Sequence, residues 1–258
     1  TCRAAHARTQ SHANERKQDT TMTFEPSATP EQIEARQTAF NNLPDPATLV
    51  SREEIRAALL DRHTAATQDK LDAARVAICG CGGLGSTIAV ALTRIGVGHL
   101  HLIDFDRVDM TNLNRQQYFL KDLGQYKTEA LRSNLRQINP FIDITVDTVK
   151  VTDENVPTLF EHEDIICEAF DVPENKTMLV NAVLENLPSK KLVSASGMAG
   201  FRSSNLVSTR RVSKNFYFCG DGETAPVPGA GLMAPRVGVV ACHEANMITR
   251  LILGEEDA

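Results

Sequence analysis

A cluster of glycines between two apolar segments most constrains the fold of this chain. The cluster follows an expected strand at 75–79 and opens an expected helix at 85–96, and Asp104 ends the next expected strand. The glycines are Gly80, Gly82, Gly83 and Gly85. This order is typical of a nucleotide-binding βαβ unit, in which the helix N-terminus faces phosphate and the acid binds ribose hydroxyls. The alternative, that the glycines serve only strand-to-helix packing, stays open, and the pattern does not identify the nucleotide.

Strands and helices alternate through the middle of the chain. The expected strands are 75–79, 99–104, 142–149, 164–170 and 191–196, with helices at 85–96, 126–138, 153–162 and 173–187. This alternation predicts an α/β, Rossmann-like fold with a doubly wound, mostly parallel sheet, because buried parallel strands are continuous apolar runs joined by crossover helices. The last third predicts added antiparallel strands at 206–212 and 216–219, a Gly/Pro-rich loop at 220–235 and a C-terminal helix at 236–253.

The length of 258 residues suits one large domain, which we place at 25–258. Residues 1–24 are polar, and Met22 resembles an internal start, so we expect a disordered extension there. The domain is expected to comprise N-terminal helices at 30–72, a nucleotide-binding core at 73–197 and a C-terminal part at 198–254. The first helix would end near Asn42, and Ser51 and Glu54 would form a capping box at the second.

Composition narrows the function classes. The formal charge of −6 argues against a nucleic-acid partner, because such a surface must neutralise many phosphates. No apolar stretch is long enough to span a bilayer and no signal-peptide core is visible, so we expect a cytoplasmic protein without a membrane partner. The six cysteines are scattered along the chain, so we predict reduced thiols. They include no C-x-x-C pair, so we predict no zinc site.

Polar residues after Asp104 favour ATP over a dinucleotide. Asp106, Asn112, Arg115 and Lys127 follow in order. A triphosphate carries about four negative charges, which an arginine fork, a lysine and an amide donor would suit. Taken singly, Arg115 or Lys127 is more often a solvated surface charge, so the prediction rests on the order and spacing of the whole set.

Asp171 follows an apolar strand and precedes Pro173, so it should lie at the carboxyl edge of the sheet, where ligands bind in open α/β folds. One interpretation is a helix N-cap, which aspartate favours. The other is a Mg²⁺ ligand, since magnesium takes one or two carboxylates together with phosphate oxygens.

Together these motifs resemble one family. The strings GCGGLGS, IDFDRVDMTNLNRQ and GQYKTEA, with the strand end at Asp171, resemble the ThiF/MoeB/HesA branch of ubiquitin-activating-type enzymes over about residues 56–254. The tail strings SASGMAGF, FYFCGDG and GLMAPRVG are most similar to those of short ThiF-type sulfur-carrier adenylyltransferases.

The resemblance implies an adenylyltransferase. The C-terminal Gly-Gly carboxylate of a ubiquitin-like, ThiS-type sulfur carrier of thiamine thiazole biosynthesis would attack ATP and release pyrophosphate. By motif, the glycine loop cradles the nucleotide, with Asp106 beside it, and Asp104 binds the ribose. The phosphates would be held by Asn112, Arg115 and Lys127, and Mg²⁺ by Asp171.

The resemblance also implies partners. Family members form homodimers in which an arginine from an N-terminal helix reaches the other subunit's ATP; Arg62 is the candidate here, followed by Arg56. A sulfurtransferase would act downstream. Some relatives use a cysteine to hold sulfur or carrier, and Cys219 is the best placed, although a lone cysteine on an apolar strand is more often a packing residue. The zinc site of many relatives cannot be carried over, because its cysteine pairs are missing.

Three alternatives remain at this point. An NAD-dependent oxidoreductase would explain the glycines and Asp104 but not Arg115, Lys127 or Asp171. A family member could instead act on a molybdopterin-type carrier, a peptide or a tRNA base. A third possibility is a nucleotide-binding scaffold without turnover.

Overall fold

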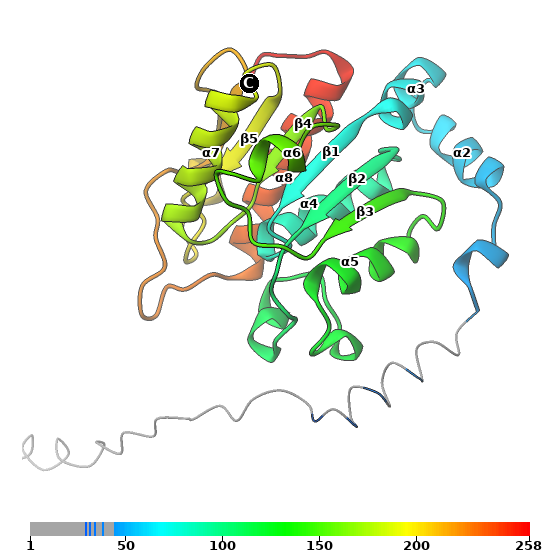
Figure 1. Ribbon diagram of the computed structural model, residues 1–258, viewed down its shortest axis with the longest axis horizontal. Helices are drawn as coiled ribbons and strands as arrows, with labels where there is room; N and C mark the ends of the chain where they lie inside the picture. The colour runs from blue at the N-terminus through cyan, green and yellow to red at the C-terminus, as the bar shows by residue number, and fades with distance from the viewer. Residues whose placement is uncertain (1–28, 30, 32–33, 35–37, 39–43) are drawn as a thin grey trace, which may run out of the picture.

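The computed structural model describes residues 29, 31, 34, 38 and 44–258 (Figure 1). The expected disordered extension and almost all of the first expected N-terminal helix lie outside these residues. None of the described helices is both long and apolar enough to cross a membrane.

The core of the described chain is a seven-stranded sheet in the order β3-β2-β1-β4-β5-β7-β6. The strands are β1 (Arg75–Cys79), β2 (His99–Ile103), β3 (Asp143–Asp147), β4 (Ile165–Glu168), β5 (Lys191–Ala195), β6 (Ser208–Arg211) and β7 (Phe216–Gly220). All neighbouring pairs are parallel except β6 and β7. The predicted Rossmann-like α/β class is confirmed, and of the two added strands β6 alone runs antiparallel, because β7 pairs in parallel with β5.

Helices cover both faces of this sheet (Figure 1). They are α4 (Gly83–Arg94), α5 (Lys127–Arg136), α6 (Val156–Leu159), α7 (Pro173–Asn186) and α8 (Ala234–Leu253). Alternate residues of β1 face opposite layers, as the pleat requires. Val76 and Ile78 pack in the core that α4, α5 and α8 share, whereas Ala77 and Cys79 pack toward α6 and α7.

Within residues 44–74, the helices α2 (Arg52–Leu60) and α3 (Ala65–Ala73) precede β1. The predicted capping box of α2 is confirmed, since the Glu54 amide donates to Ser51 Oγ at 3.1 Å and the Ser51 amide donates to Glu54 Oε2 at 2.7 Å. Because α3 leads directly into β1, both helices lie near the amino ends of the central strands.

The expected helix at 153–162 is much shorter than predicted. Residues 153–155 instead form a turn, in which Asn155 Oδ1 accepts from the Thr152 amide at 2.8 Å, and Phe160 leaves the helix to enter the core. Short 3-10 helices occupy the connections: η1 (Pro46–Thr48), η2 (Met110–Asn114), η3 (Leu120–Asp122) and η4 (Ser204–Leu206). Hydrophobic periodicity predicts long elements well, but such turns depend on local side-chain bonds.

Candidate functional site

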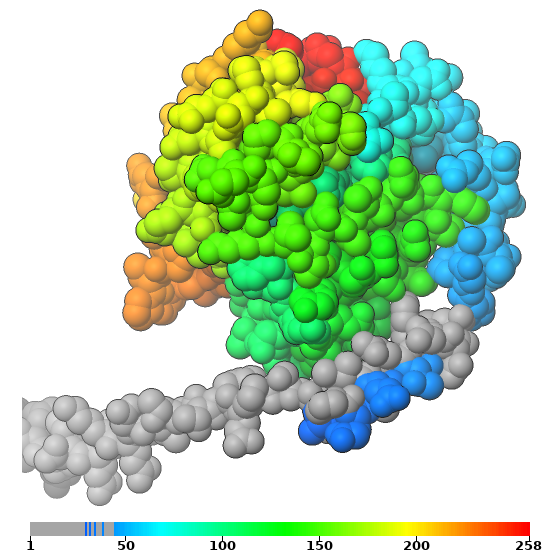
Figure 2. Space-filling view, in the orientation of Figure 1, coloured from blue at the N-terminus to red at the C-terminus, as the bar shows by residue number. Residues whose placement is uncertain are grey.

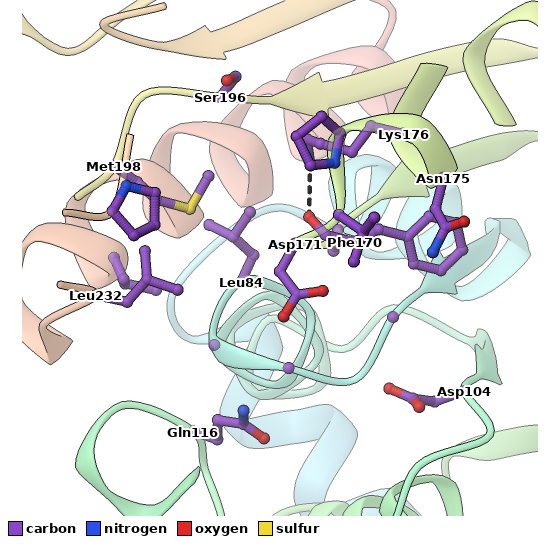
Figure 3. Close-up of a pocket in the computed structure, with 18 of the residues that line it drawn as sticks. Leu84, Asp104, Gln116, Phe170, Asp171, Asn175, Lys176, Ser196, Met198 and Leu232 are labelled. Atoms are coloured by element: carbon purple, nitrogen blue, oxygen red, sulfur yellow. Dashed lines mark hydrogen bonds between the residues drawn. The ribbon is translucent and has the colours of Figure 1, made fainter. Parts of the chain in front are cut away.

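A cavity of about 510 Å³ opens where the central parallel strands end (Figure 3). This size suits a small-molecule ligand. Eight of the predicted residues line it: Gly80, Gly82, Gly83, Asp104, Asp106, Arg115, Lys127 and Asp171. The fold thus brings together side chains that are far apart in the sequence.

Gly80 and Gly85 shape the loop between β1 and α4. Gly80 has a φ of 96°, and a Cβ there would lie 2.9 Å from the Ala169 carbonyl oxygen. A Cβ on Gly85 would lie only 1.8 Å from the Gly80 carbonyl oxygen. Gly85 does not line the cavity. The packing interpretation therefore describes Gly85 better than a direct contact with a ligand.

The N-terminus of α4 faces the cavity without a side-chain cap. Its N-cap residue is Gly82, which has no side chain that could cap the helix. Gly82 and Gly83 both line the cavity. The N–H groups of a first helical turn have no partner within the helix, and the helix dipole favours a nearby anion. This end of α4 can therefore bind phosphate oxygens.

Asp104 ties the end of β2 to the glycine loop. Its Oδ2 accepts from the Cys81 amide at 2.7 Å, and its Oδ1 accepts from the Asp106 amide at 2.8 Å. The side chain is buried but lines the cavity. A carboxylate has about four acceptor sites, so Asp104 can bind ribose hydroxyls while it fixes the loop.

Two cations reach the cavity from the segment after β2. Lys127 begins α5, and its Nζ lies 2.7 Å from Asp106 Oδ2. The lysine side chain is 8% exposed and the aspartate 51%, so the pair can open toward a ligand from the aspartate side. Arg115 is half-buried and donates to Asn114 Oδ1 at 2.8 Å.

Asn112 lies outside the residues that line the cavity. Its Oδ1 accepts from the Asp109 amide at 2.9 Å, which closes the first turn of η2. The side chain of Asn112 therefore stabilises the turn that precedes Arg115. The position of Asn112 in the sequence could not distinguish this structural role from phosphate binding.

Asp171 lies between β4 and α7, and its carboxylate points into the cavity (Figure 3). The N-cap residue of α7 is Val172, and no side chain caps the helix. The helix-cap interpretation of Asp171 is therefore wrong. Within the described chain, its carboxylate makes no recorded hydrogen bond or ion pair, which leaves both oxygens available to a ligand.

Behind Asp171 lies a polar network that was not predicted from the sequence. Glu168 is fully buried at the end of β4, and its carboxylate accepts from Lys176 Nζ at 2.9 Å and from Ser194 Oγ at 2.6 Å. Lys176 also lines the cavity (Figure 3). A glutamate within an apolar strand, followed by a lysine in the first turns of the next helix, was the signal that could have revealed this pair.

The candidate arginines for a neighbouring subunit lie away from the cavity. Arg56 pairs with Asp69 at 2.7 Å and with Asp72, which joins α2 to α3. Arg62 is exposed in the turn between these helices. Neither lines the cavity of its own chain. A contact between Arg62 and a bound nucleotide would therefore need a second subunit.

Cys219 is fully buried on β7. Burial, reinforced by the nearby Glu244 carboxyl, raises the pKa of this thiol to about 12. Because the thiolate is the nucleophilic form, Cys219 is unreactive at neutral pH. The structure therefore favours the packing interpretation of this cysteine.

The loop after β7 lines the far end of the cavity through Thr224, Pro226 and Leu232. It projects from the side of the molecule (orange in Figure 2). Asp221 anchors its base: Oδ2 lies 2.7 Å from a nitrogen of the buried Arg236, and Oδ1 accepts from the Thr224 amide at 2.9 Å. These bonds outweigh the effect of burial and lower the pKa of Asp221 to about 2.

The chain is similar in sequence to several known proteins. Residues 55–258 match the model of the ThiF family. A molybdopterin-synthase adenylyltransferase of Haemophilus influenzae is 33% identical over 69% of this chain and 74% of that protein. An adenylyltransferase and sulfurtransferase, MOCS3, of Culex quinquefasciatus is 29% identical over 73% of this chain, which spans only 44% of that protein. These names agree with the nucleotidyltransferase class expected from the sequence.

Solved structures share the fold. The tRNA N6-threonylcarbamoyladenosine dehydratase TcdA of E. coli, in complex with ATP, superposes with a TM-score of 0.69 at 22% identity, over 77% of this chain and 93% of that one. The E. coli protein MccB with ATP gives a TM-score of 0.56 at 24% identity, over 74% of this chain and 59% of that one. At these identities the likeness establishes the architecture only.

Proposed function

The chain belongs to the ThiF family, and from that premise we propose that it adenylates the C-terminal carboxylate of a small ubiquitin-like sulfur carrier with ATP. One observation carries the proposal. A single cavity gathers an uncapped helix N-terminus, the cations of Arg115 and Lys127 and the free carboxylate of Asp171. A hydride-transferring NAD enzyme has no need of this set.

The proposed reaction joins a carboxylate oxygen to the α-phosphorus of ATP. The bond from that phosphorus to the bridging oxygen of the β-phosphate breaks, and its electron pair leaves with pyrophosphate. Negative charge grows on the phosphates as this happens, so fixed cations stabilise the transition state more than the ground state. Lys127 and Arg115 take this role, and the N-terminus of α4 holds the phosphate chain.

Asp171 is the residue that would hold magnesium. Its carboxylate is free, and no group of three or more His, Cys, Asp or Glu side chains in the described chain could bind a metal unaided. Phosphate oxygens and water would therefore complete the coordination, which is the arrangement that Mg²⁺ prefers. When bound, the ion would neutralise phosphate charge and orient the chain of phosphates.

The far end of the cavity suits a carrier tail. Met198, Thr224, Pro226 and Leu232 line it, and the loop that supplies three of them is anchored by the Asp221–Arg236 pair. A tail that ends in glycines could fit between these residues, because glycine has no side chain to collide with them. The tail would enter here and place its carboxylate beside the α-phosphate.

Two carriers remain candidates. The tail strings favour a ThiS-type carrier, whereas the name of the Haemophilus influenzae relative favours a molybdopterin-synthase carrier. We further infer a single adenylating domain over 25–258, a cytoplasmic location, a sulfurtransferase acting downstream, and a homodimer in which Arg62 or Arg56 reaches the neighbouring nucleotide.

Pyrophosphate exchange into ATP, measured with each carrier, tests the proposal. Exchange should require magnesium and a carrier with its terminal Gly-Gly, and a carrier lacking the last glycine serves as the matched control. The carrier that supports exchange identifies the substrate. Equal exchange with the truncated carrier would contradict adenylation of the terminal carboxylate.

A further inference from the structure

The Glu168–Lys176 pair lies directly behind Asp171 and has no assigned role in the proposed reaction. We propose that Lys176, held by Glu168, is a positioning residue that fixes the direction in which Asp171 presents its carboxylate. The inference rests on the proposed function of Asp171 as the magnesium ligand and assigns the residues that orient it.

The hydrogen bonds of the pair converge on one peptide group. Lys176 Nζ donates to the Phe170 carbonyl oxygen at 2.8 Å, the bond drawn in Figure 3. That oxygen belongs to the peptide that joins Phe170 to Asp171. On the other side of the same residue, the Phe170 amide donates to Glu168 Oε1 at 2.8 Å. Both peptide groups of Phe170 are therefore fixed immediately before Asp171.

Asp171 depends on this support because its carboxylate makes no hydrogen bond or ion pair with the rest of the described chain. Its neighbours along the chain do not compensate, since α7 begins at Pro173 without a side-chain cap. The orientation of the carboxylate is then set by the backbone that precedes it. A ligand side chain without such support would sample several directions and bind an ion less well.

The burial of the pair shows that Lys176 is not a free cation for phosphate. Glu168 is 0% exposed and Lys176 is 15% exposed. Breaking a buried pair leaves an uncompensated charge, which is strongly unfavourable. Lys127 differs, because its partner Asp106 is half exposed and can rotate away. Lys127 is therefore available to bind phosphates, whereas Lys176 holds the backbone next to Asp171.

Glu168 is itself fully supplied with donors. Ser194 Oγ, on the neighbouring strand β5, donates to Glu168 Oε2 at 2.6 Å, so the network ties the ends of β4 and β5 together. A pair that served only to hold these strands would not need the bond from Lys176 to the carbonyl before Asp171. That bond is the observation that separates positioning from simple packing.

The test compares Lys176→Met and Lys176→Arg in the full chain, with Lys190→Met as the matched control. Lys190 precedes β5 at the opposite edge of the sheet and donates to the Glu161 carbonyl. Calorimetric titration of Mn²⁺ into protein saturated with a non-hydrolysable ATP analogue gives the metal affinity without turnover. Lys176→Met should weaken this affinity about 10-fold to 100-fold, the usual effect of losing a support of a metal ligand. Lys176→Arg should restore part of it, and Lys190→Met should leave it unchanged.

Asp171→Asn and the double variant Asp171→Asn/Lys176→Met complete the cycle. If Lys176 acts through Asp171, the double variant should bind Mn²⁺ no more weakly than Asp171→Asn alone. Losses that multiply, or an unchanged affinity in Lys176→Met, would overturn the inference. Should Lys176→Met fail to fold by circular dichroism, Ser194→Ala, which removes one donor from Glu168, should give a smaller loss in the same direction, and no loss there would overturn it too.

The same experiments separate this inference from the function. If the unaltered protein supports no pyrophosphate exchange with either carrier, the proposed adenylation is wrong, while the metal titration still reports on Lys176. If exchange occurs and depends on Asp171 but metal affinity does not depend on Lys176, only the positioning role is wrong.

Discussion

Single residues decide how the cavity handles charge. Lys127 has its aliphatic stem buried and its ammonium group against Asp106, so a cation is held at the cavity wall before any ligand arrives. Such preorganisation is effective because little reorganisation is needed when charge develops in the reaction.

The first prediction concerns this lysine. Lys127→Met should lower carrier-dependent pyrophosphate exchange by about 10² to 10³, the usual cost of one lost transition-state contact. Lys190→Met is the control and should retain the rate of the unaltered protein. An exchange rate that survives in Lys127→Met would remove this residue from the mechanism.

The second prediction concerns Cys219. A thiol with a pKa of about 12 is almost wholly protonated at neutral pH, so it should not form a covalent link to carrier or sulfur. Cys219→Ala should therefore retain exchange, and iodoacetamide should alkylate the exposed Cys242 of the folded protein before it alkylates Cys219. Rapid modification of Cys219, or loss of exchange in Cys219→Ala, would contradict the packing role.

At the scale of elements, the parallel sheet and its crossover helices were predictable because their apolar runs are long. Gly80 and Asp104 were predictable for the same reason, since each directly follows a strand that the pattern locates. Glu168 and Lys176 were missed, because their contact depends on how α7 returns over β4. Spacing alone was also ambiguous for Asn112. Its position in the sequence suggested phosphate binding, whereas its side-chain oxygen accepts a hydrogen bond within η2.

The loop after β7 is an element whose anchoring can be tested by pH. The hydrogen bonds of Asp221 lower its pKa to about 2, below the ordinary value of 3.8. A lowered carboxyl pKa contributes stability above the unfolded-state pKa, and this contribution is lost as the pH falls toward 2. Asp221→Asn should therefore cost up to about 2 kcal/mol of unfolding free energy at pH 7.

Urea unfolding from pH 7 to pH 3 provides the measurement. The difference between the unaltered protein and Asp221→Asn should be largest above about pH 4 and should shrink below it, because Asp221 then takes up a proton in the unfolded state while it is still ionised in the folded state. A difference that stays constant with pH would show that the ionised carboxylate of Asp221 does not anchor the loop.

At the scale of the whole molecule, the cavity draws on distant parts of the chain. Strand ends supply Asp104 and the approach to Asp171, the segment before α5 supplies Arg115, and the loop after β7 and the first turn of α8 supply Leu232 and Val237. The ends that we propose for the nucleotide and for the carrier tail thus belong to one continuous cavity. That continuity underlies the central claim that a protein tail is joined to AMP here.

Intact-mass analysis of the carrier after a rapid acid quench tests this claim most directly. With ATP and magnesium, the account predicts that the carrier gains the mass of one adenylyl group, which is AMP less one water, and that pyrophosphate is released in equal amount. A carrier of unchanged mass, with ATP converted to ADP and phosphate or left intact, would contradict it.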